Sequence, residues 1–483
     1  MIVRPHITLV VLGCVAALCA LLMFVFPQEG VMIGNVKLRF PTWSALSDTT
    51  ANNKIEDVEK YLAQLDSLSA ADSLNADSVL HVQRVQLITS LQFKDNDASS
   101  FYQLFEALDS AQHGLHVHVL HYGDSQIECD RMSGNLREKL QIQFGGNGPG
   151  LVSPLPLAAT SHCSQSNSGN WKRHTSYGFD DGKIPHNKFG AMCSFARFTP
   201  ALKSKADIDS TQTHEAWFEM RPSGMAQPHS KIFHEATMYL GNHHLPFTLT
   251  VKADDQIISE QKIEVGIGMQ MLKWKLESTP KKIRFIFSGA DSPDVYAVAL
   301  NDVSGVSLSN IALRGNDGKA LNRVNSAEMQ GMMDDAGADL LILQFGGNAV
   351  PYLKNETAAR AYGKAFQSQI QYMKRCAPGA AILVTGPSDM STSIDGVMRT
   401  WPFLAELNEG MKEAAFAEGC AFWDMFNVMG GENSMVSWVK NSPPYAGPDY
   451  THFTPAGARK MAELMYKAIA DEYQLWQNAQ SGI

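Results

Sequence analysis

The sequence has few charged residues and only a small excess of one sign. Asp, Glu, Lys and Arg make up 18% of the 483 residues, and 40 basic against 49 acidic residues give a net charge of −9. A mildly acidic chain is a poor binder of polyanions, so we expect no nucleic-acid partner. The hydrophobic fraction of 45% excludes a disordered chain, and the low charge excludes a coiled coil rich in Glu and Lys.

Cysteine is also scarce, and its spacing matches no metal or redox motif. The seven cysteines include no Cys-x-x-Cys pair, so a zinc ribbon or a thioredoxin-like site has no support. In an oxidising compartment Cys163 could pair with Cys193, or Cys376 with Cys420. The sequence does not choose between these connectivities.

One long hydrophobic run is present, at the N-terminus. Residues 7–26 contain Thr8 as their only clearly polar member, and twenty residues are about the length that a helix needs to cross a bilayer core. The bulky exit Phe24-Val25-Phe26-Pro27 is unlike a signal-peptidase site, and Val11-Leu12-Gly13-Cys14 matches a lipoprotein box only weakly. We expect residues 1–30 to anchor the protein in the inner membrane, with the catalytic region exported to the periplasm or another extracytoplasmic space.

The spacing of apolar residues divides the remaining chain into four parts. Residues 31–110 show helical spacing without recognisable chemistry, which predicts a helical stalk and linker. A β-rich run at 115–122, followed by a helical segment, opens an α/β domain in residues 111–150. Residues 151–305 hold short β-like runs separated by turns, which predicts an inserted β-sandwich or jelly roll. The α/β alternation resumes over residues 306–483.

Individual elements can be predicted in the last two parts. Within the insert we expect strands at 216–220, 247–251, 282–287 and 295–300. After it we expect strands at 340–345, 381–386 and 421–424, helices at 361–375 and 402–418, and a final helix from Pro455. Trp171, Trp217 and Trp274 of the insert are expected in its core rather than on a sugar-binding face.

Three short motifs stand where strands end or the last helix begins. Gly123-Asp124-Ser125 and Gly346-Gly347-Asn348 each follow an expected strand, and Asp449-Tyr450-Thr451-His452 precedes the final helix. Parallel strands share one carboxyl edge, where open α/β sheets bind ligands. A serine hydroxyl, a histidine base and an aspartate that orients the histidine are the groups of nucleophilic catalysis. Each motif alone is ordinary turn or capping chemistry, but the three together predict a serine hydrolase.

The order of these motifs resembles the SGNH (GDSL-like) hydrolase superfamily. Its members carry a serine in a first block, a glycine in a second, an asparagine in a third and Asp-x-x-His in a last. The resemblance implies a three-layer, flavodoxin-like α/β fold with a parallel sheet. It also implies that Ser125 is the nucleophile, His452 the general base and Asp449 the residue that orients the base.

The same resemblance implies an oxyanion hole. The backbone N–H of Ser125 and the side chain of Asn348 would supply two of its donors. Gly315, which directly follows a β-like run, is the best match to the glycine of the second block, and Gly305 is the weaker candidate.

A closer resemblance is to peptidoglycan O-acetylesterases of this superfamily, which carry a β-sandwich between the first and second blocks. The stretch from Phe144 to Gly150 and the later Trp423-Asp424 and Met429-Gly430-Gly431 are similar to motifs of those enzymes. Two positions depart from the superfamily pattern. Gln126 follows the serine where the older superfamily name implies leucine, and Ala349 follows the asparagine where many members have aspartate.

The resemblance implies a serine esterase that removes acetyl groups from peptidoglycan or another envelope polysaccharide, without a metal or an organic cofactor. Two alternatives stay open. Transfer of the acetyl group to a sugar would make the protein an O-acetyltransferase that works beside an integral-membrane acetyl-transfer partner. An inert α/β fold would make it a tethered glycan-binding scaffold, a reading that the intact Ser125, Asp449 and His452 disfavour.

Overall fold

The computed structural model describes residues 31–33, 36–38, 88–178, 182–202 and 204–481. The expected membrane anchor and most of the expected stalk lie outside these residues. Within the described part of the chain, no helix combines the length and the apolar character that a membrane span requires. Near the N-terminus, β1 (Val31–Ile33) and β2 (Val36–Leu38) pair as an antiparallel hairpin.

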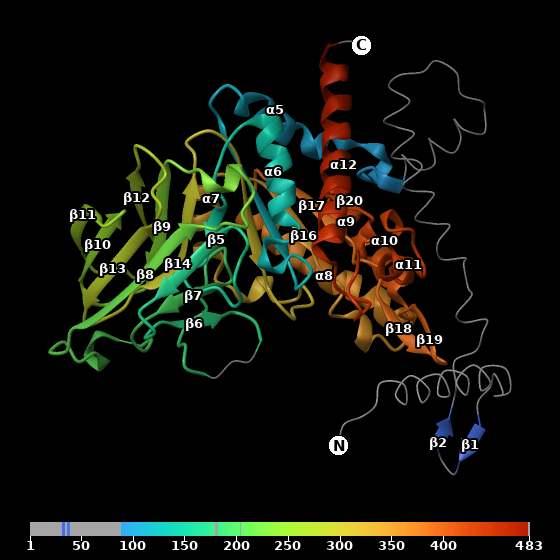
Figure 1. The fold of residues 1–483 in the computed structure, drawn as a ribbon, viewed down its shortest axis with the longest axis horizontal. Helices are drawn as coiled ribbons and strands as arrows, with labels where there is room; N and C mark the ends of the chain where they lie inside the picture. Colours follow the sequence, from blue (N-terminus) through green and yellow to red (C-terminus); the bar gives the residue numbers. More distant parts are fainter. Residues whose placement is uncertain (1–30, 34–35, 39–87, 179–181, 203, 482–483) are drawn as a thin grey trace, which may run out of the picture.

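The α/β domain is built on a five-stranded parallel sheet with the order β15-β3-β16-β17-β20 (Figure 1). Its strands are β3 (His116–Gly123), β15 (Gly305–Ala312), β16 (Ala338–Gln344), β17 (Ala381–Thr385) and β20 (Ala421–Trp423). Counted along the chain within this sheet, the order is 2-1-3-4-5, the flavodoxin-like arrangement. The predicted α/β fold with a parallel sheet is therefore confirmed.

Helices cover both faces of this sheet. They are α5 (Tyr102–Ala111), α6 (Ser133–Phe144), α7 (Ser326–Ala336), α8 (Glu356–Cys376), α9 (Leu404–Ala417) and α12 (Pro455–Ser481). Val117 and Val119 of β3 pack with α5, α6 and α12, whereas Leu120 and Tyr122 pack with α7, α8 and α9. Since side chains alternate along a strand, β3 is buried on both faces, as its continuous apolar run predicts.

Smaller elements follow β17 and β20 along the chain. They are the hairpin β18 (Ser391–Ile394) and β19 (Val397–Thr400), and the short helices α10 (Met425–Val428) and α11 (Ser434–Lys440). No pattern in the sequence predicted this hairpin.

The α/β domain begins earlier than the sequence indicated, because residues 88–110 are part of it and not of a stalk. The backbones of Gln92 and Phe422 exchange two hydrogen bonds of 2.8 Å, and the indole N–H of Trp423 donates to the carbonyl of Thr89 at 3.0 Å. Phe105 and Leu108 of α5 are buried in the same core as α6 and α12. The apolar stripe of α5 is therefore a core face.

The insert is a separate pair of antiparallel sheets (Figure 1). One has the order β11-β10-β13-β8-β5 and the other β12-β9-β14-β7-β6, with β4 paired to β14. The strands are β4 (Gly150–Val152), β5 (Cys163–Asn167), β6 (Lys172–Thr175), β7 (Ser194–Arg197), β8 (His214–Pro222), β9 (Glu235–Gly241), β10 (Phe247–Ala253), β11 (Gln256–Ile263), β12 (Gln270–Lys275), β13 (Ile283–Gly289) and β14 (Asp294–Asn301). Side chains of both sheets, such as Phe285 and Met238, share one buried core, so the predicted strand-rich insert is confirmed.

Two of the three tryptophans of the insert lie in this core. Trp171 and Trp274 are buried there, as expected, whereas the guanidinium of Arg284 lies 4.3 Å from the ring centre of the half-buried Trp217. All five cysteines of the described residues are free thiols, so neither of the two possible disulfides is formed.

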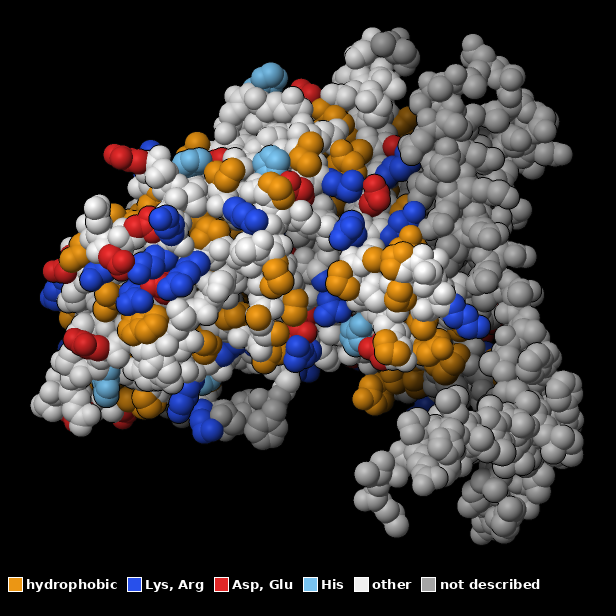
Figure 2. Space-filling view, viewed as in Figure 1, with side chains coloured by type: hydrophobic (Ala, Val, Ile, Leu, Met, Phe, Trp, Pro, Cys, Tyr) orange, Lys and Arg blue, Asp and Glu red, His pale blue; other side chains and the backbone are white. Residues whose placement is uncertain are grey.

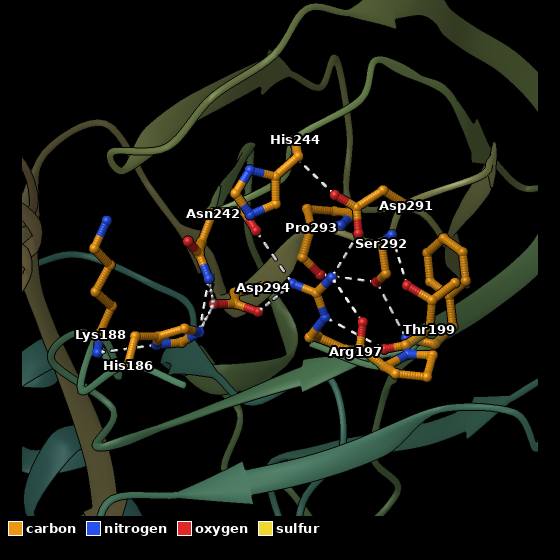
Figure 3. A network of polar contacts seen from close by, with 12 residues as sticks. His186, Lys188, Arg197, Thr199, Asn242, His244, Asp291, Ser292, Pro293 and Asp294 are labelled. Atoms are coloured by element: carbon orange, nitrogen blue, oxygen red, sulfur yellow. Dashed lines mark hydrogen bonds and ion pairs between the residues drawn. The ribbon is translucent and has the colours of Figure 1, made fainter. Parts of the chain in front are cut away.

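A buried ion cluster joins the strands of the insert (Figure 3). We call Arg197, Asp291, Asp294, Asn242 and His186 the Arg197 cluster. The guanidinium of Arg197 lies 2.7 Å from a carboxylate oxygen of Asp291 and 2.8 Å from one of Asp294. Asp294 also accepts a hydrogen bond from the side-chain amide of Asn242 at 3.0 Å and lies 3.2 Å from the ring of His186.

The Arg197 cluster also reaches the contact between the two domains. His186 lies in the connection between β6 and β7, and Phe189 and Ala191 of this connection are buried in a core of the α/β domain. Lys188 of the same connection lies 3.8 Å from Glu328 of α7. The cluster therefore fixes the sandwich to the segment that packs on the α/β domain.

Cationic and anionic side chains lie intermixed on the face of the insert that Figure 2 shows. Examples are the ion pair of Lys282 with Asp255 at 2.8 Å and that of Lys273 with Glu235 at 2.9 Å. Mixed charges of this kind keep a surface soluble without creating a field of one sign.

Candidate active site

The structure brings the serine, histidine and aspartate motifs together at the carboxyl edge of the parallel sheet. Oγ of Ser125 lies 2.8 Å from Nε2 of His452, although 327 positions separate the two residues. Nδ1 of the same imidazole lies 2.8 Å from a carboxylate oxygen of Asp449. A continuous hydrogen-bonded chain thus runs from hydroxyl to imidazole to carboxylate.

The serine stands at the tip of a tight turn that follows β3. Gly123 ends the strand so close to β16 that an added Cβ would lie 3.0 Å from the carbonyl oxygen of Gln344 and 2.9 Å from the side chain of Ile127. The carboxylate of Asp124 accepts the backbone N–H of Gln126 at 2.9 Å, which closes the turn around Ser125. This turn leaves the Ser125 hydroxyl half-buried at the sheet edge.

The aspartate both shapes the histidine loop and orients the imidazole. One carboxylate oxygen of Asp449 accepts the backbone N–H groups of Thr451 and His452, each at 3.1 Å. Burial alone would raise the pKa of the Asp449 carboxyl, but the hydrogen bonds from His452 and Thr451 outweigh it, and the pKa lies below its usual value. Because an ionised carboxylate only accepts, it takes Nδ1–H and leaves Nε2 as the acceptor that faces Ser125.

Asn348 reaches the same edge from the loop after β16. Its side-chain amide donates to a carboxylate oxygen of Asp124 at 3.0 Å and to the carbonyl of Asn316 at 3.1 Å. Burial raises the pKa of Asp124 to about 6, although the hydrogen bonds from the Gln126 N–H and from Asn348 oppose this shift. Both amide hydrogens of Asn348 are thus engaged, and donation to an oxyanion would require one of them to be shared.

The two candidate glycines of the second block lie in different places. Gly315 stands at the carboxyl end of β15, in an exposed turn with φ of +75°, and the N–H of Leu313 beside it donates to the carbonyl of Gly123 at 2.7 Å. Gly315 does not line the cavity described below, and its role as an oxyanion donor stays a prediction. Gly305 pairs with His116 at the amino end of β15, on the opposite edge of the sheet, so the weaker candidate is wrong.

A cavity of about 280 Å³ opens beside the serine and the histidine. Its walls include residues of all three motifs together with side chains that the motifs did not predict: Gln126, Phe345, Tyr352, Ser388, Met390 and Trp401. Tyr352 is 81% exposed at this site. These residues come from separate strand-end loops, and no periodicity or short motif in the sequence marks such convergence.

No group of three His, Cys, Asp or Glu side chains in the described ranges is arranged to hold a metal ion. The chemistry of the cavity is that of a nucleophilic hydroxyl with an oriented base.

Comparison with known proteins identifies the domain. Residues 280–460 match the model of the GDSL-like Lipase/Acylhydrolase family, a stretch that contains Asn348, Asp449 and His452 but not Ser125. Residues 280–460 therefore belong to an SGNH (GDSL-like) hydrolase domain. The prediction of a hydrolytic enzyme of this superfamily is therefore confirmed. No curated protein sequence matches the chain.

The fold resembles that of a solved peptidoglycan O-acetylesterase. The TM-score is 0.62 at 19% sequence identity, over 80% of this chain and 99% of the other. Two further structures align only with low scores. An acetyl xylan esterase has a TM-score of 0.26 at 20% identity, over 34% of this chain and 81% of its own. A family two carbohydrate esterase from Clostridium thermocellum has 0.22 at 11% identity, over 63% and 99%.

Proposed function

We propose that this SGNH hydrolase is a serine esterase that removes acetyl groups from an O-acetylated envelope polysaccharide. The observation that carries the proposal is the hydrogen-bonded chain from Ser125 through His452 to Asp449 at the wall of an open cavity. The fold similarity to a solved peptidoglycan O-acetylesterase, over 80% of this chain, supports the choice of an acetylated glycan as the substrate.

The geometry fits a two-step mechanism through an acyl-enzyme. The hydroxyl of Ser125 attacks the acetyl carbonyl while Nε2 of His452 accepts its proton, and the carboxylate of Asp449 stabilises the imidazolium. The tetrahedral intermediate collapses as His452 returns the proton to the departing sugar oxygen, which leaves acetyl-Ser125. Water activated by His452 then attacks this ester, and acetate leaves as the Ser125 hydroxyl forms again.

Negative charge on the carbonyl oxygen needs donors at the same edge. We propose the backbone N–H of Ser125 and the side-chain amide of Asn348 for this role, with Gly315 as a third donor. The hydrogen bond to Asp124 holds the Asn348 amide at the cavity wall. The amide is therefore in position before negative charge develops on the carbonyl oxygen.

Two aromatic side chains favour a sugar as the leaving group. Tyr352 and Trp401 both line the cavity, and Tyr352 is largely exposed there. Exposed aromatic rings beside a site offer apolar faces against which the C–H faces of a sugar ring can pack. We propose that these two side chains contact the acetylated sugar.

The proposal is tested by acetate release from O-acetylated peptidoglycan and from other O-acetylated glycans. We expect release by the wild-type protein, loss of release in Ser125→Ala, and labelling of the wild type alone by a serine-directed phosphonate. Full activity of Ser125→Ala on an aryl acetate would refute the mechanism. If acetylated sugar forms when the protein is incubated with an acetyl donor and glycan oligomers, the acceptor is a sugar and the enzyme is an O-acetyltransferase.

We further propose that residues 7–26 hold this activity at the inner membrane, with the catalytic region exported. The apolar length of this segment supports the proposal. We expect the full chain to stay with membranes after alkaline extraction, and a chain without residues 1–30 to be released. Release of both proteins would contradict it.

A further inference from the structure

Gln126, the residue after the serine, connects the nucleophile turn to the histidine loop. Its side chain is buried, with 7% exposed. The side-chain amide donates to the carbonyl of Thr451 at 2.6 Å and to the hydroxyl of Ser388 at 2.9 Å. The side-chain carbonyl accepts the backbone N–H of Phe453 at 3.3 Å.

These contacts fall on both sides of the catalytic imidazole. Thr451 and Phe453 are the two chain neighbours of His452, and Ser388 follows β17. A single amide therefore joins three loops: its own after β3, the loop after β17 and the loop between α11 and α12. We propose that Gln126 is a positioning residue that sets the distance between the imidazole of His452 and the hydroxyl of Ser125. The inference rests on the proposed function, because it takes this serine and this histidine as the reacting pair.

Other hydrogen bonds of the loop that carries His452 join residues within that loop. The bonds from Thr451 and His452 to Asp449, and the bond from the N–H of Gly447 to the carbonyl of His452 at 2.8 Å, hold the internal shape of the loop. They do not reach the turn that carries Ser125. Gln126 supplies the link across to that turn. At this position the superfamily name implies leucine, whose side chain cannot form these hydrogen bonds.

A matched pair of substitutions tests this role. In Gln126→Met the side chain keeps its length and loses its three hydrogen bonds, and we expect kcat on an aryl acetate to fall about 10- to 100-fold while KM stays within about twofold. Gln141 is the control, because it is also buried and donates to two backbone carbonyls, those of Gly148 and Val306, at 3.0 Å each. It does not line the cavity, and we expect Gln141→Met to lower stability without lowering the kcat of the folded protein.

The outcomes separate this inference from the proposed function. If the wild type releases no acetate, or as much as Ser125→Ala, the proposed function fails. If the wild type is active and Gln126→Met keeps kcat within about twofold, or loses no more than Gln141→Met does, the positioning role is wrong.

A second substitution keeps the test valid if Gln126→Met folds poorly. In Gln126→Glu an ionised carboxylate can accept from Phe453 but cannot donate to the carbonyl of Thr451, whereas a protonated carboxyl can. We expect the kcat of Gln126→Glu, divided by that of the wild type at each pH, to rise as the pH falls. The titratable groups beside its partners are Asp124, Asp389, Asp449 and His452, and the ratio removes their contribution because the wild type carries them too. A ratio independent of pH would contradict the inference.

Discussion

Two polar networks of this protein differ in how far their side chains are exposed to solvent. In the Arg197 cluster of the insert, the side chains of Arg197 and Asp294 are 2% and 0% exposed, and every charge is paired. At the catalytic edge, the side chains of His452 and Asp449 are 36% and 52% exposed. A deeply buried charge must be paired with an opposite charge, since isolation would cost far more than folding supplies. The reacting chain stays open to solvent, where substrate and water can reach it.

The two regions also bury carboxylates in different ways. Asp291 and Asp294 meet the cation of Arg197, whereas Asp124 and Asp389 accept hydrogen bonds from neutral donors. Burial accordingly raises the pKa of Asp124, and that of Asp389, to about 6. A cation beside Asp124 would disfavour the imidazolium that forms on His452 during the reaction. Neutral donors at the catalytic edge avoid that repulsion.

The largest effect is expected on activity alone. In His452→Ala we expect kcat/KM on an aryl acetate to fall by about 10⁴ to 10⁶, because both proton transfers lose their carrier. The unfolding temperature should change little, since the imidazole is half-exposed. His234→Ala is the control, because His234 lies 2.6 Å from Asp302 in a similar pair and is 42% exposed. If His452→Ala unfolded, the catalytic network would also be required for stability, and the two networks would not differ in this respect.

The Arg197 cluster should show the reverse behaviour. In Arg197→Met two carboxylates lose their cation, and we expect a loss of about 3 to 5 kcal/mol in the free energy of unfolding of the insert, measured with denaturant. The kcat of the protein that remains folded should stay the same. Lys262→Met in the same domain is the control, since Lys262 is 63% exposed in its pair with Glu264 and should contribute less than about 1 kcal/mol. A loss as small as that of the control would show that the cluster adds no stability.

The next effect concerns the oxyanion donor. In Asn348→Ala we expect kcat to fall by about 10² to 10³, the usual loss for one such donor. Asn355→Ala is the matched control, because the Asn355 side chain caps α8 by accepting the N–H of Ala358 at 2.8 Å. It should lower stability by about 1 kcal/mol and leave kcat unchanged. Equal kcat values for the two variants would remove Asn348 from the oxyanion hole.

Asp124, a buried carboxyl with no cation beside it among the described residues, should also contribute to the pH dependence of the free energy of unfolding. Burial raises the pKa of Asp124 from 3.8 to about 6, so between these values the folded protein binds more protons at this site than the unfolded chain. Stability must then fall as the pH rises through that window, by up to about 3 kcal/mol. We expect Asp124→Asn to remove this part of the slope when unfolding is followed from about pH 4 to about pH 7.

An ion-paired carboxyl provides the contrast. Burial alone would raise the pKa of Asp130, but the guanidinium of Arg137 at 2.7 Å holds it well below its usual range. Its contribution to stability is present above the unfolded pKa of about 4 and is lost as the pH falls further. Asp130→Asn should therefore flatten the stability curve only at the acidic end. Identical curves for the two variants would refute the difference between a buried carboxyl with a cation partner and one without.

The smallest effect is expected at the aromatic wall. Tyr352→Ala should raise KM for an O-acetylated glycan by roughly 2- to 10-fold, as expected for one lost ring contact, with kcat unchanged. On a small aryl acetate the same variant should behave as the wild type. Tyr102→Ala, which removes another exposed ring outside the cavity, is the control. A higher KM on both substrates would place Tyr352 in the acetyl site instead.

The parts of the structure that local patterns encode were predictable. β16 and β17 lie within one or two residues of the expected runs, because buried parallel strands are continuously apolar. Helix α12 begins at Pro455 as expected. Ser125 and Asn348 could be found because open α/β sheets place such residues at strand ends, and His452 because its Asp-x-x-His motif stands just before the last helix.

The remaining parts depend on contacts between distant segments. Arg197 meets partners 94 and 97 positions away, so no window of sequence contains the cluster. Gln126 reads as a departure from a motif, and only the folded loops show its contacts with Thr451 and Phe453. The apolar stripe of α5 predicts a helix with an apolar face, but periodicity does not show what covers that face, so the stalk expected there is in fact part of the α/β domain.

The pairing of β4 with β14 has a consequence for biosynthesis. Leu151 lies opposite Ala299, so the chain enters and leaves the insert side by side, and the carbonyl of Gly145 accepts the N–H of Val306 at 2.8 Å just outside it. The ribosome delivers β3 long before its neighbour β15, and the central sheet cannot close until the intervening residues bring their two ends together. The folded sandwich therefore holds its two ends side by side, which places β15 next to β3, the strand that leads into the serine turn.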